Sequence, residues 1–156
     1  MQTHDDIRIV DFEPGHQASF KRLNEAWITR WFAMEEADHH ALDHPDEHIL
    51  AKGGHILIAL SKDEPVGTCA LLRQDAASFE LAKMSVAEHL RGRGVGLLLG
   101  RAAIDRARQL GARRLCLESS TRLEPAINLY RKLGFREIQG APSHFARCNI
   151  QMELIL

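Results

Sequence analysis

The 156-residue chain has few cysteines, a small net charge and no long apolar run, and each absence excludes a class of protein. No apolar stretch approaches the ~18–20 residues that a membrane-spanning helix needs. The first residues, MQTHDDIRIV, lack the basic segment and apolar core of a secretory signal. With 20 Lys+Arg against 21 Asp+Glu the net charge is −1, whereas proteins dedicated to nucleic acids are usually basic. We therefore expect a cytoplasmic protein that binds neither membranes nor nucleic acids.

The cysteines are too few and too widely spaced to form a disulfide framework or a structural zinc site. Cys69, Cys116 and Cys148 are an odd number, and no two of them make a CxxC pair. Each stands among strand-forming residues. We therefore expect three small buried side chains in a reducing compartment.

One group of histidines has the spacing of metal ligands. His40, His44 and His48 repeat at i, i+4 and i+8, which would bring three imidazoles together on a helix. Pro45 falls inside this stretch and breaks the helix. A solvated polar segment is therefore the favoured interpretation, and we expect no metal cofactor.

Apolar residues recur with the periods of strands and helices along the chain, and no repeat, low-complexity tract or linker interrupts them. Residues 35–50 are expected to form a more polar helix or loop. The order of elements predicts one α+β domain over residues 1–156, built around a central sheet. The expected strands cover residues 7–12, 55–60, 66–73, 79–86, 114–118 and 148–156, and the other expected helices cover residues 14–31, 95–111 and 124–133.

A glycine-rich run joins one of these strands to a long helix. Arg91-Gly92-Arg93-Gly94-Val95-Gly96 precedes a helix that has no acidic residue until Asp105. Unpaired N–H groups at a helix start suit a phosphate, and glycines let the backbone approach it closely. The Lys-Ser/Thr of a P-loop is absent after Gly96, and the third glycine of the dinucleotide motif is missing. A dinucleotide site stays an alternative because Glu118 ends the next strand, where an acid would bind a ribose.

Three motifs in this order resemble the GNAT family of N-acetyltransferases. They are the strand Glu80-Leu81-Ala82-Lys83-Met84-Ser85-Val86, the R-x-x-G-x-G run from Arg91, and Asn128-Leu129-Tyr130-Arg131-Lys132-Leu133-Gly134-Phe135. Within the family, the chain is similar to the acetyltransferase modules sometimes fused to winged-helix regulators, although we expect no regulator before this first strand. The resemblance implies the α+β GNAT fold, with a mixed central sheet of about six or seven strands flanked by about four helices.

The resemblance also implies an activity. Family members transfer an acetyl group from acetyl-CoA directly to a primary amine, here expected to belong to a small molecule or a peptide. The alternative is a GNAT-fold module that senses acyl-CoA with little turnover. A homodimer is common in the family, although no residue of this chain demands one.

The resemblance assigns the cofactor contacts to two segments. The backbone of Met84, Ser85 and Val86 is expected to hydrogen-bond the pantetheine arm, as an added strand would. The family often has an asparagine at the position of Leu123, so Asn128 or Ser120 is expected to replace that contact. The pyrophosphate is expected to bind main-chain amides of Arg91, Gly92, Arg93, Gly94, Val95 and Gly96.

Two side chains are expected to carry the proton transfers. An alkyl amine with a pKa near ~10 is almost wholly protonated at pH 7, and deprotonation adds roughly 4–5 kcal/mol to the barrier unless a base assists. Glu80 matches the family's general base, and period two places it on the same strand face as Met84 and Val86. A solvated carboxylate or a partner of Lys83 is the alternative for Glu80. Tyr130 matches the tyrosine that protonates the departing thiolate, with core packing as its alternative.

The charges of the chain are segregated. Residues 34–48 carry six acids, four histidines and no Lys or Arg, whereas residues 91–114 carry seven arginines and one acid. The basic block surrounds the loop expected to hold the anionic cofactor. We expect the acidic block to border the acceptor side and to attract a cationic amine through Glu35, Glu36 and Asp38.

Three further residues have alternative interpretations. Trp27 and Trp31, one helical turn apart, are interpreted as core or as pocket wall rather than as a stacking platform. His144 precedes the last strand, in a stretch where the family often lines the acceptor site, and an ordinary loop residue is its alternative. Neither feature identifies the amine.

Overall fold

The centre of the molecule is a seven-stranded sheet in the order β1-β2-β3-β4-β5-β7-β6, seen in a computed structural model that describes residues 6–140, 143 and 145–156. The β4–β5 pair is parallel, and every other pair is antiparallel. This mixed sheet confirms the expected fold class. The strands are β1 (Ile7–Asp11), β2 (His55–Ser61), β3 (Glu64–Asp75), β4 (Ser78–Val86), β5 (Arg114–Ser119), β6 (Arg136–Ile138) and β7 (Ile150–Ile155).

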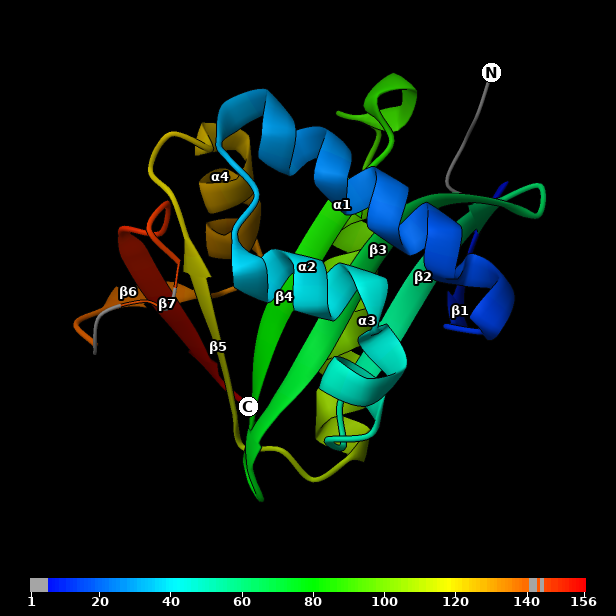
Figure 1. The fold of residues 1–156 in the computed structure, drawn as a ribbon. Helices are drawn as coiled ribbons and strands as arrows, with labels where there is room; N and C mark the ends of the chain where they lie inside the picture. Colours follow the sequence, from blue (N-terminus) through cyan, green and yellow to red (C-terminus); the bar gives the residue numbers. More distant parts are fainter. Residues whose placement is uncertain (1–5, 141–142, 144) are drawn as a thin grey trace.

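Helices cover both faces of the sheet (Figure 1). The first two α-helices cross one face over the middle strands, and the other two pack on the opposite face. The helices are α1 (Gln17–Trp31), α2 (Glu36–Asp43), α3 (Val95–Gln109) and α4 (Glu124–Lys132), with short turns η2 (Pro14–His16), η3 (Asp46–Leu50) and η4 (Glu88–Leu90).

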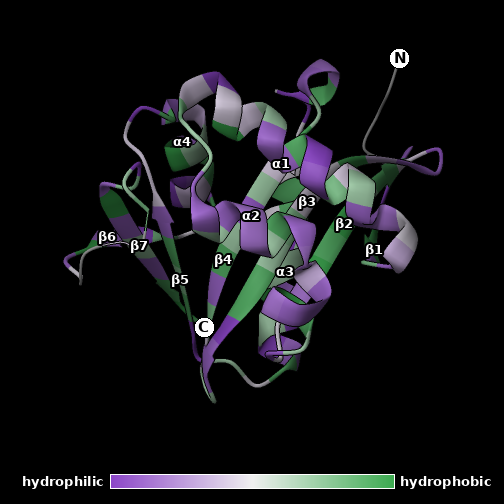
Figure 2. Ribbon diagram, in the orientation of Figure 1, coloured by the Kyte–Doolittle hydropathy of each residue, from purple (hydrophilic) through white to green (hydrophobic). Residues whose placement is uncertain are grey.

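Each face of the sheet buries its own apolar core. Phe79, Leu99 and Leu117 belong to the core under α3 and α4, whereas Phe20 and Ile58 belong to the core under α1 and α2. Apolar residues accordingly concentrate on the central strands, while hydrophilic residues alternate along the helices (Figure 2). None of the described helices is both long and apolar enough to cross a membrane.

The elements match the expected ones closely, with differences at three places. Pro45 does end a helix: α2 stops at Asp43, and a single π-helical turn follows at η3. β3 is longer than residues 66–73, and β7 begins at Ile150 rather than at Cys148. β6 was not predicted, because three residues are too few to show a period of two.

Candidate active site

β4 and β5 diverge after a short common stretch, and a pocket opens between them. The two strands pair over three residues, ending at Glu80 and Cys116, whereas β4 continues to Val86. Within the described strand pairings, residues 81–86 therefore have no partner on the β5 side. The pocket has a volume of about 660 Å³ and is lined by β4, the loop before α3, the end of β5 and α4.

A β-bulge interrupts β4 beside this pocket. The pairs Thr68–Ser85 and Ala70–Ala82 leave Cys69 of β3 facing two residues of β4, Lys83 and Met84. Lys83 has a φ of 54°, in the left-handed region. That conformation costs a residue with a side chain roughly 1–2 kcal/mol.

The bulge places the two ends of β4 on different faces of the sheet. Before it, Glu80 pairs with Leu72, which packs on the core under α1 and α2. After it, Met84 and Val86 pack on the core under α3 and α4. The prediction that Glu80 shares a face with Met84 and Val86 is therefore wrong, because the extra residue reverses the alternation of side chains.

The loop before α3 leads into a helix start that no side chain caps. Gly92 and Gly94 have φ values of 76° and 86°, which favour glycine at both positions. No side chain caps α3, and its first turn has no acidic residue, so its first N–H groups stay available. The Arg91 Nε–H donates to the Val86 carbonyl oxygen at 3.3 Å. The loop residues that line the pocket are Arg91, Gly92, Gly94, Val95 and Gly96, whereas the exposed Arg93 does not.

α4 presents one face to the pocket. Ala126, Leu129 and Tyr130 line it. The Tyr130 ring meets Phe135 edge to face, with ring centroids 6.1 Å apart. Burial raises the pKa of the Tyr130 hydroxyl above its ordinary value of 10. The hydroxyl therefore keeps its proton at neutral pH.

The two residues expected to replace the family asparagine lie in different places. Ser120 is buried and lines the pocket beside Leu123. Its Oγ accepts a hydrogen bond from the Arg122 backbone N–H at 3.2 Å. Asn128 is exposed and lies outside the pocket lining, on the side of α4 opposite Tyr130.

Two carboxylates line the pocket on the face of α1 and α2. Glu80 Oε1 accepts a hydrogen bond from Gln74 Nε2 at 3.3 Å, and Glu118 Oε2 is buried with no partner among the described residues. Burial, reinforced by repulsion from Glu118, raises the pKa of Glu80 to about 7. Sequence reasoning missed Glu118 as a neighbour of Glu80 in this pocket. Period two from Cys116, the partner of Glu80, would have placed it on this face.

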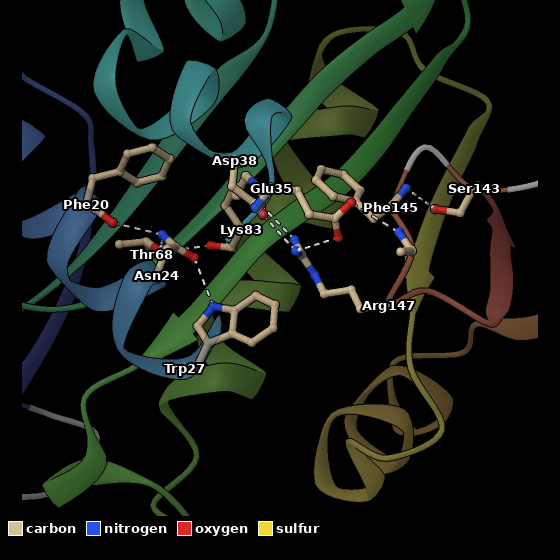
Figure 3. A network of polar contacts seen from close by, with 11 residues as sticks. Phe20, Asn24, Trp27, Glu35, Asp38, Thr68, Lys83, Ser143, Phe145 and Arg147 are labelled. Atoms are coloured by element: carbon tan, nitrogen blue, oxygen red, sulfur yellow. Dashed lines mark hydrogen bonds and ion pairs between the residues drawn. The ribbon is translucent and has the colours of Figure 1, made fainter. Parts of the chain in front are cut away.

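A buried ion cluster joins α2, the bulge and the segment before β7 (Figure 3). The fully buried Asp38 accepts a hydrogen bond from Lys83 Nζ at 3.0 Å and two from Arg147 at 2.7 Å. Arg147 also donates to Glu35 at 3.4 Å, and the Phe145 ring lies 4.3 Å from its guanidinium carbon. Burial alone would raise the pKa of Asp38, but the Arg147 hydrogen bonds and the Lys83 charge lower it to about 2.

This cluster contradicts the role predicted for the acidic segment. Asp38 and Glu35 are bonded to cations inside the protein, so neither presents a free charge to an acceptor amine. Glu36 is exposed and lies near His40 on α2. The partners of Asp38 are 45 and 109 residues away in sequence, a distance that local patterns do not span.

Replacing Asp38 by Asn is expected to lower the free energy of unfolding by about 3–5 kcal/mol, because the buried Lys83 and Arg147 lose the negative charge that they share. Because the pKa of Asp38 is lowered, its contribution is complete above the ordinary value of 3.8 and disappears as pH falls through about 2. Urea denaturation at pH 7 and between pH 4 and 2 measures both effects.

Asp11→Asn is the matched control. Asp11 pairs with Arg106 at 2.7 Å, but its side chain is 67% exposed, so the expected loss is below about 1 kcal/mol. Equal losses in the two variants would contradict a structural role for the buried cluster.

The remaining expected residues have mixed outcomes. Trp27 and Trp31 line the pocket, which confirms their interpretation as wall residues. The rings of His40 and His48 stack, with centroids 5.1 Å apart, and no group of three or more metal-binding side chains occurs among the described residues. His144 lies outside the described residues.

The expectation of three buried cysteines is correct only for Cys69. Cys116 and Cys148 are half-buried, and Cys148 lines the pocket. Burial raises the pKa of all three thiols, so each is mostly protonated at neutral pH.

Comparison with known proteins identifies the family. A protein of Escherichia coli (strain K12), named an uncharacterized N-acetyltransferase YjgM, is 34% identical over 89 residues, which cover 55% of this chain. The chain thus matches about half of that relative, 53% of its length.

Solved structures share the fold along nearly the whole chain. An acetyltransferase of the GNAT family from Staphylococcus aureus Mu50 has a TM-score of 0.85 at 21% identity and covers 94% of this chain and 97% of its own. The structure of YncA from Salmonella typhimurium with its cofactor acetyl-CoA has a TM-score of 0.76 at 17% identity and covers 96% and 94%. The model of the acetyltransferase (GNAT) family matches residues 19–135, and the chain therefore belongs to this family.

Proposed function

We propose that this protein is an N-acetyltransferase that moves the acetyl group of acetyl-CoA directly to a primary amine of a small molecule or peptide. The two-sided pocket between β4 and β5 is the observation that carries this proposal. Glu80 and Glu118 line it from one face of the sheet, and Tyr130 lines it from the other. Direct transfer needs one group that takes a proton from the amine and one that gives a proton to the departing sulfur.

The pocket fits an elongated thioester with a phosphorylated end. Residues 81–86 offer backbone groups that an extended amide chain can pair with, as a neighbouring strand would. At the loop, the N-terminus of α3 and Arg91 suit phosphate groups. Acetyl-CoA, the ligand of the YncA structure, would supply an acetyl thioester in this pocket. The proposed contacts are Met84, Ser85, Val86 and the loop residues that line the pocket.

The amine is proposed to lose its proton to the carboxylates. Because the pKa of Glu80 is about 7, this group is partly ionised at neutral pH and is basic enough to accept a proton. Glu118 Oε2, buried without a partner in the described part of the chain, is placed to accept a hydrogen bond from the amine. The pair therefore both attracts and deprotonates a cationic acceptor.

The opposite face of the pocket is proposed to hold the acid. Tyr130 keeps its proton at neutral pH and can donate it to a thiolate that leaves. Cys116 and Cys148 are poor nucleophiles because burial raises the pKa of both thiols. Their chemistry supports direct transfer without a covalent intermediate on the enzyme.

A panel of primary amines, with release of free thiol as the readout, tests the function. At least one amine is expected to accelerate thiol release from acetyl-CoA. In Gly94→Ala, the KM for acetyl-CoA is expected to rise about tenfold with the KM for the amine unchanged, because alanine strains the loop at a φ of 86°.

Gly111→Ala is the matched control, since Gly111 has a φ of 83° at the other end of α3. A Cβ there would meet no atom within 4 Å, so only stability is expected to fall. Tight binding of acetyl-CoA without acceleration by any amine would instead support the acyl-CoA-sensing alternative.

A further inference from the structure

The geometry points to Asp38 and Lys83 as positioning residues: their buried ion pair holds the β4 bulge that separates the carboxylates from the cofactor contacts. The inference rests on the proposed function, because it names what keeps the two sides of that pocket in place. Neither residue is proposed to react. Both act through the backbone of β4.

The bulge residue is held at its side chain and at its backbone (Figure 3). Lys83 Nζ donates to Asp38 Oδ1 at 3.0 Å, while the Lys83 carbonyl oxygen accepts from Thr68 Oγ1 at 2.7 Å. Thr68 Oγ1 in turn accepts from Asn24 Nδ2 at 3.1 Å. Asp38, Thr68 and Asn24 are all fully buried. These contacts fix Lys83 from α2, from β3 and from α1.

By holding the bulge, these contacts determine which face of the sheet each β4 side chain occupies. Core packing alone does not require this arrangement. A regular strand would place Glu80 on the same face as Met84 and Val86. Only the extra residue at position 83 turns Glu80 toward the acceptor face while Met84 and Val86 face α3 and α4. A lysine disfavours the φ of 54° that this requires, so its contacts must hold it there.

An ion pair is a specific way to hold this conformation. A buried pair contributes little net stability, and its best-attested use is to fix one arrangement among several. Arg147 binds Asp38 through both oxygens, so Asp38 keeps an oriented counter-charge even when the lysine is replaced. Variants at position 83 can therefore be compared in a folded protein.

The test compares Lys83→Met with Lys83→Gly. Both variants lose the ion pair, but glycine adopts a φ of 54° freely and methionine does not. In K83M, kcat is expected to fall about tenfold or more, and the acid limb of the pH–rate profile is expected to move, because Glu80 is displaced. K83G is expected to recover most of kcat and to restore the limb. Direct titration with acetyl-CoA is expected to give a higher Kd in K83M than in K83G.

Lys62 controls for the general effect of replacing a lysine of positive φ by glycine or methionine. Lys62 has a φ of 49° in the exposed turn between β2 and β3, outside the pocket lining. K62M and K62G are expected to have the kcat of the unsubstituted protein. A difference between these two variants as large as that at Lys83 would overturn the proposal.

The remaining outcomes are equally decisive. Equal losses of kcat in K83M and K83G would show that Lys83 acts through its charge and not by holding the bulge, which overturns the proposal. An unchanged kcat in K83M would overturn it too, because the ion pair would then not be needed. If K83M fails to fold, K83N is compared with K83A, and the asparagine variant is expected to be more active because it tolerates left-handed backbone. If no amine is acetylated by the unsubstituted protein, the proposed function fails. The order of acetyl-CoA affinities then still decides the role of the bulge.

Discussion

Substitution of Glu80 by Gln is expected to lower the rate of acetyl transfer about a hundredfold at pH 7, the usual contribution of a positioned general base. In the unsubstituted protein the rate should rise with pH through about 7, the pKa of Glu80. The variant should lack this limb and should recover at higher pH, where the amine loses its proton to solvent. Initial rates of thiol release from about pH 5.5 to about pH 9.5 measure the effect, because this range spans the raised pKa of Glu80 and approaches the ordinary pKa of an alkyl amine.

Two further variants separate the carboxylates. Glu118→Gln removes the charge that repels Glu80, so the limb should move to lower pH while the maximal rate falls. Glu64→Gln, at the exposed start of β3 and outside the pocket lining, should leave the profile unchanged. A Glu80 variant with an unchanged pH profile would remove this residue as the base.

Glu80→Gln is expected to raise the stability of the protein at high pH, although it lowers the rate of acetyl transfer. Because the pKa of Glu80 is raised from 4.5 to about 7, the free energy of unfolding should decrease as pH rises through that interval. The decrease is about 3 kcal/mol, from the size of the shift. E80Q should lack it, so the variant should be more stable than the unsubstituted protein at pH 8 and less active. Urea denaturation at pH 5 and pH 8 measures the difference.

Replacement of Tyr130 by Phe is expected to lower kcat about a hundredfold while the affinity for acetyl-CoA stays within a few-fold. The ring keeps its packing against Phe135, and only the hydroxyl that would protonate the departing sulfur is lost. Single-turnover rates and a binding titration separate the two quantities. A variant with unchanged kcat would show that Tyr130 is only a packing residue.

The protonation state of Tyr130 can be measured without interference from another phenol. It is the one tyrosine of the chain, so the ultraviolet absorbance of phenolate reports it alone. Burial should keep its pKa above the ordinary value of 10. Titration with a pKa below 10 would contradict the burial of the hydroxyl and weaken its role as an acid that is fully protonated at neutral pH.

Local signals predicted most of the fold and the glycine-rich loop that lines the pocket before α3. Gly92 and Gly94 mark positions of positive φ, and the acid-free start of α3 marks an uncapped helix. Both signals depend on residues that are neighbours in sequence. Pro45 is a local signal of the same kind. A proline cannot continue a helix, and α2 ends at Asp43, two residues before it.

The face of the pocket that carries Glu80 and Glu118 could not be predicted in this way. Period two predicts that Glu80, Met84 and Val86 share one face of the strand. The bulge at Lys83 reverses this alternation, and nothing in the apolar pattern of the strand reveals a bulge. The acids of residues 34–48 looked like a solvated or substrate-facing surface. Asp38 is the buried residue among them. Its role in an ion cluster becomes visible only through its contact with Arg147, which is distant in sequence.

The divergence of β4 and β5 leaves the sheet as two halves, joined through its middle by three residue pairs. On the β5 side of residues 81–86, the strand pairings of the described residues lack the ladder of hydrogen bonds that makes other sheets continuous. A ligand that lies along this edge takes the place of a strand, so occupancy and folding are thermodynamically linked. At a ligand concentration of one hundred times Kd, that linkage stabilises the folded state by about 2.7 kcal/mol. Under the proposed function, we therefore expect the protein to resist unfolding most when acetyl-CoA is abundant.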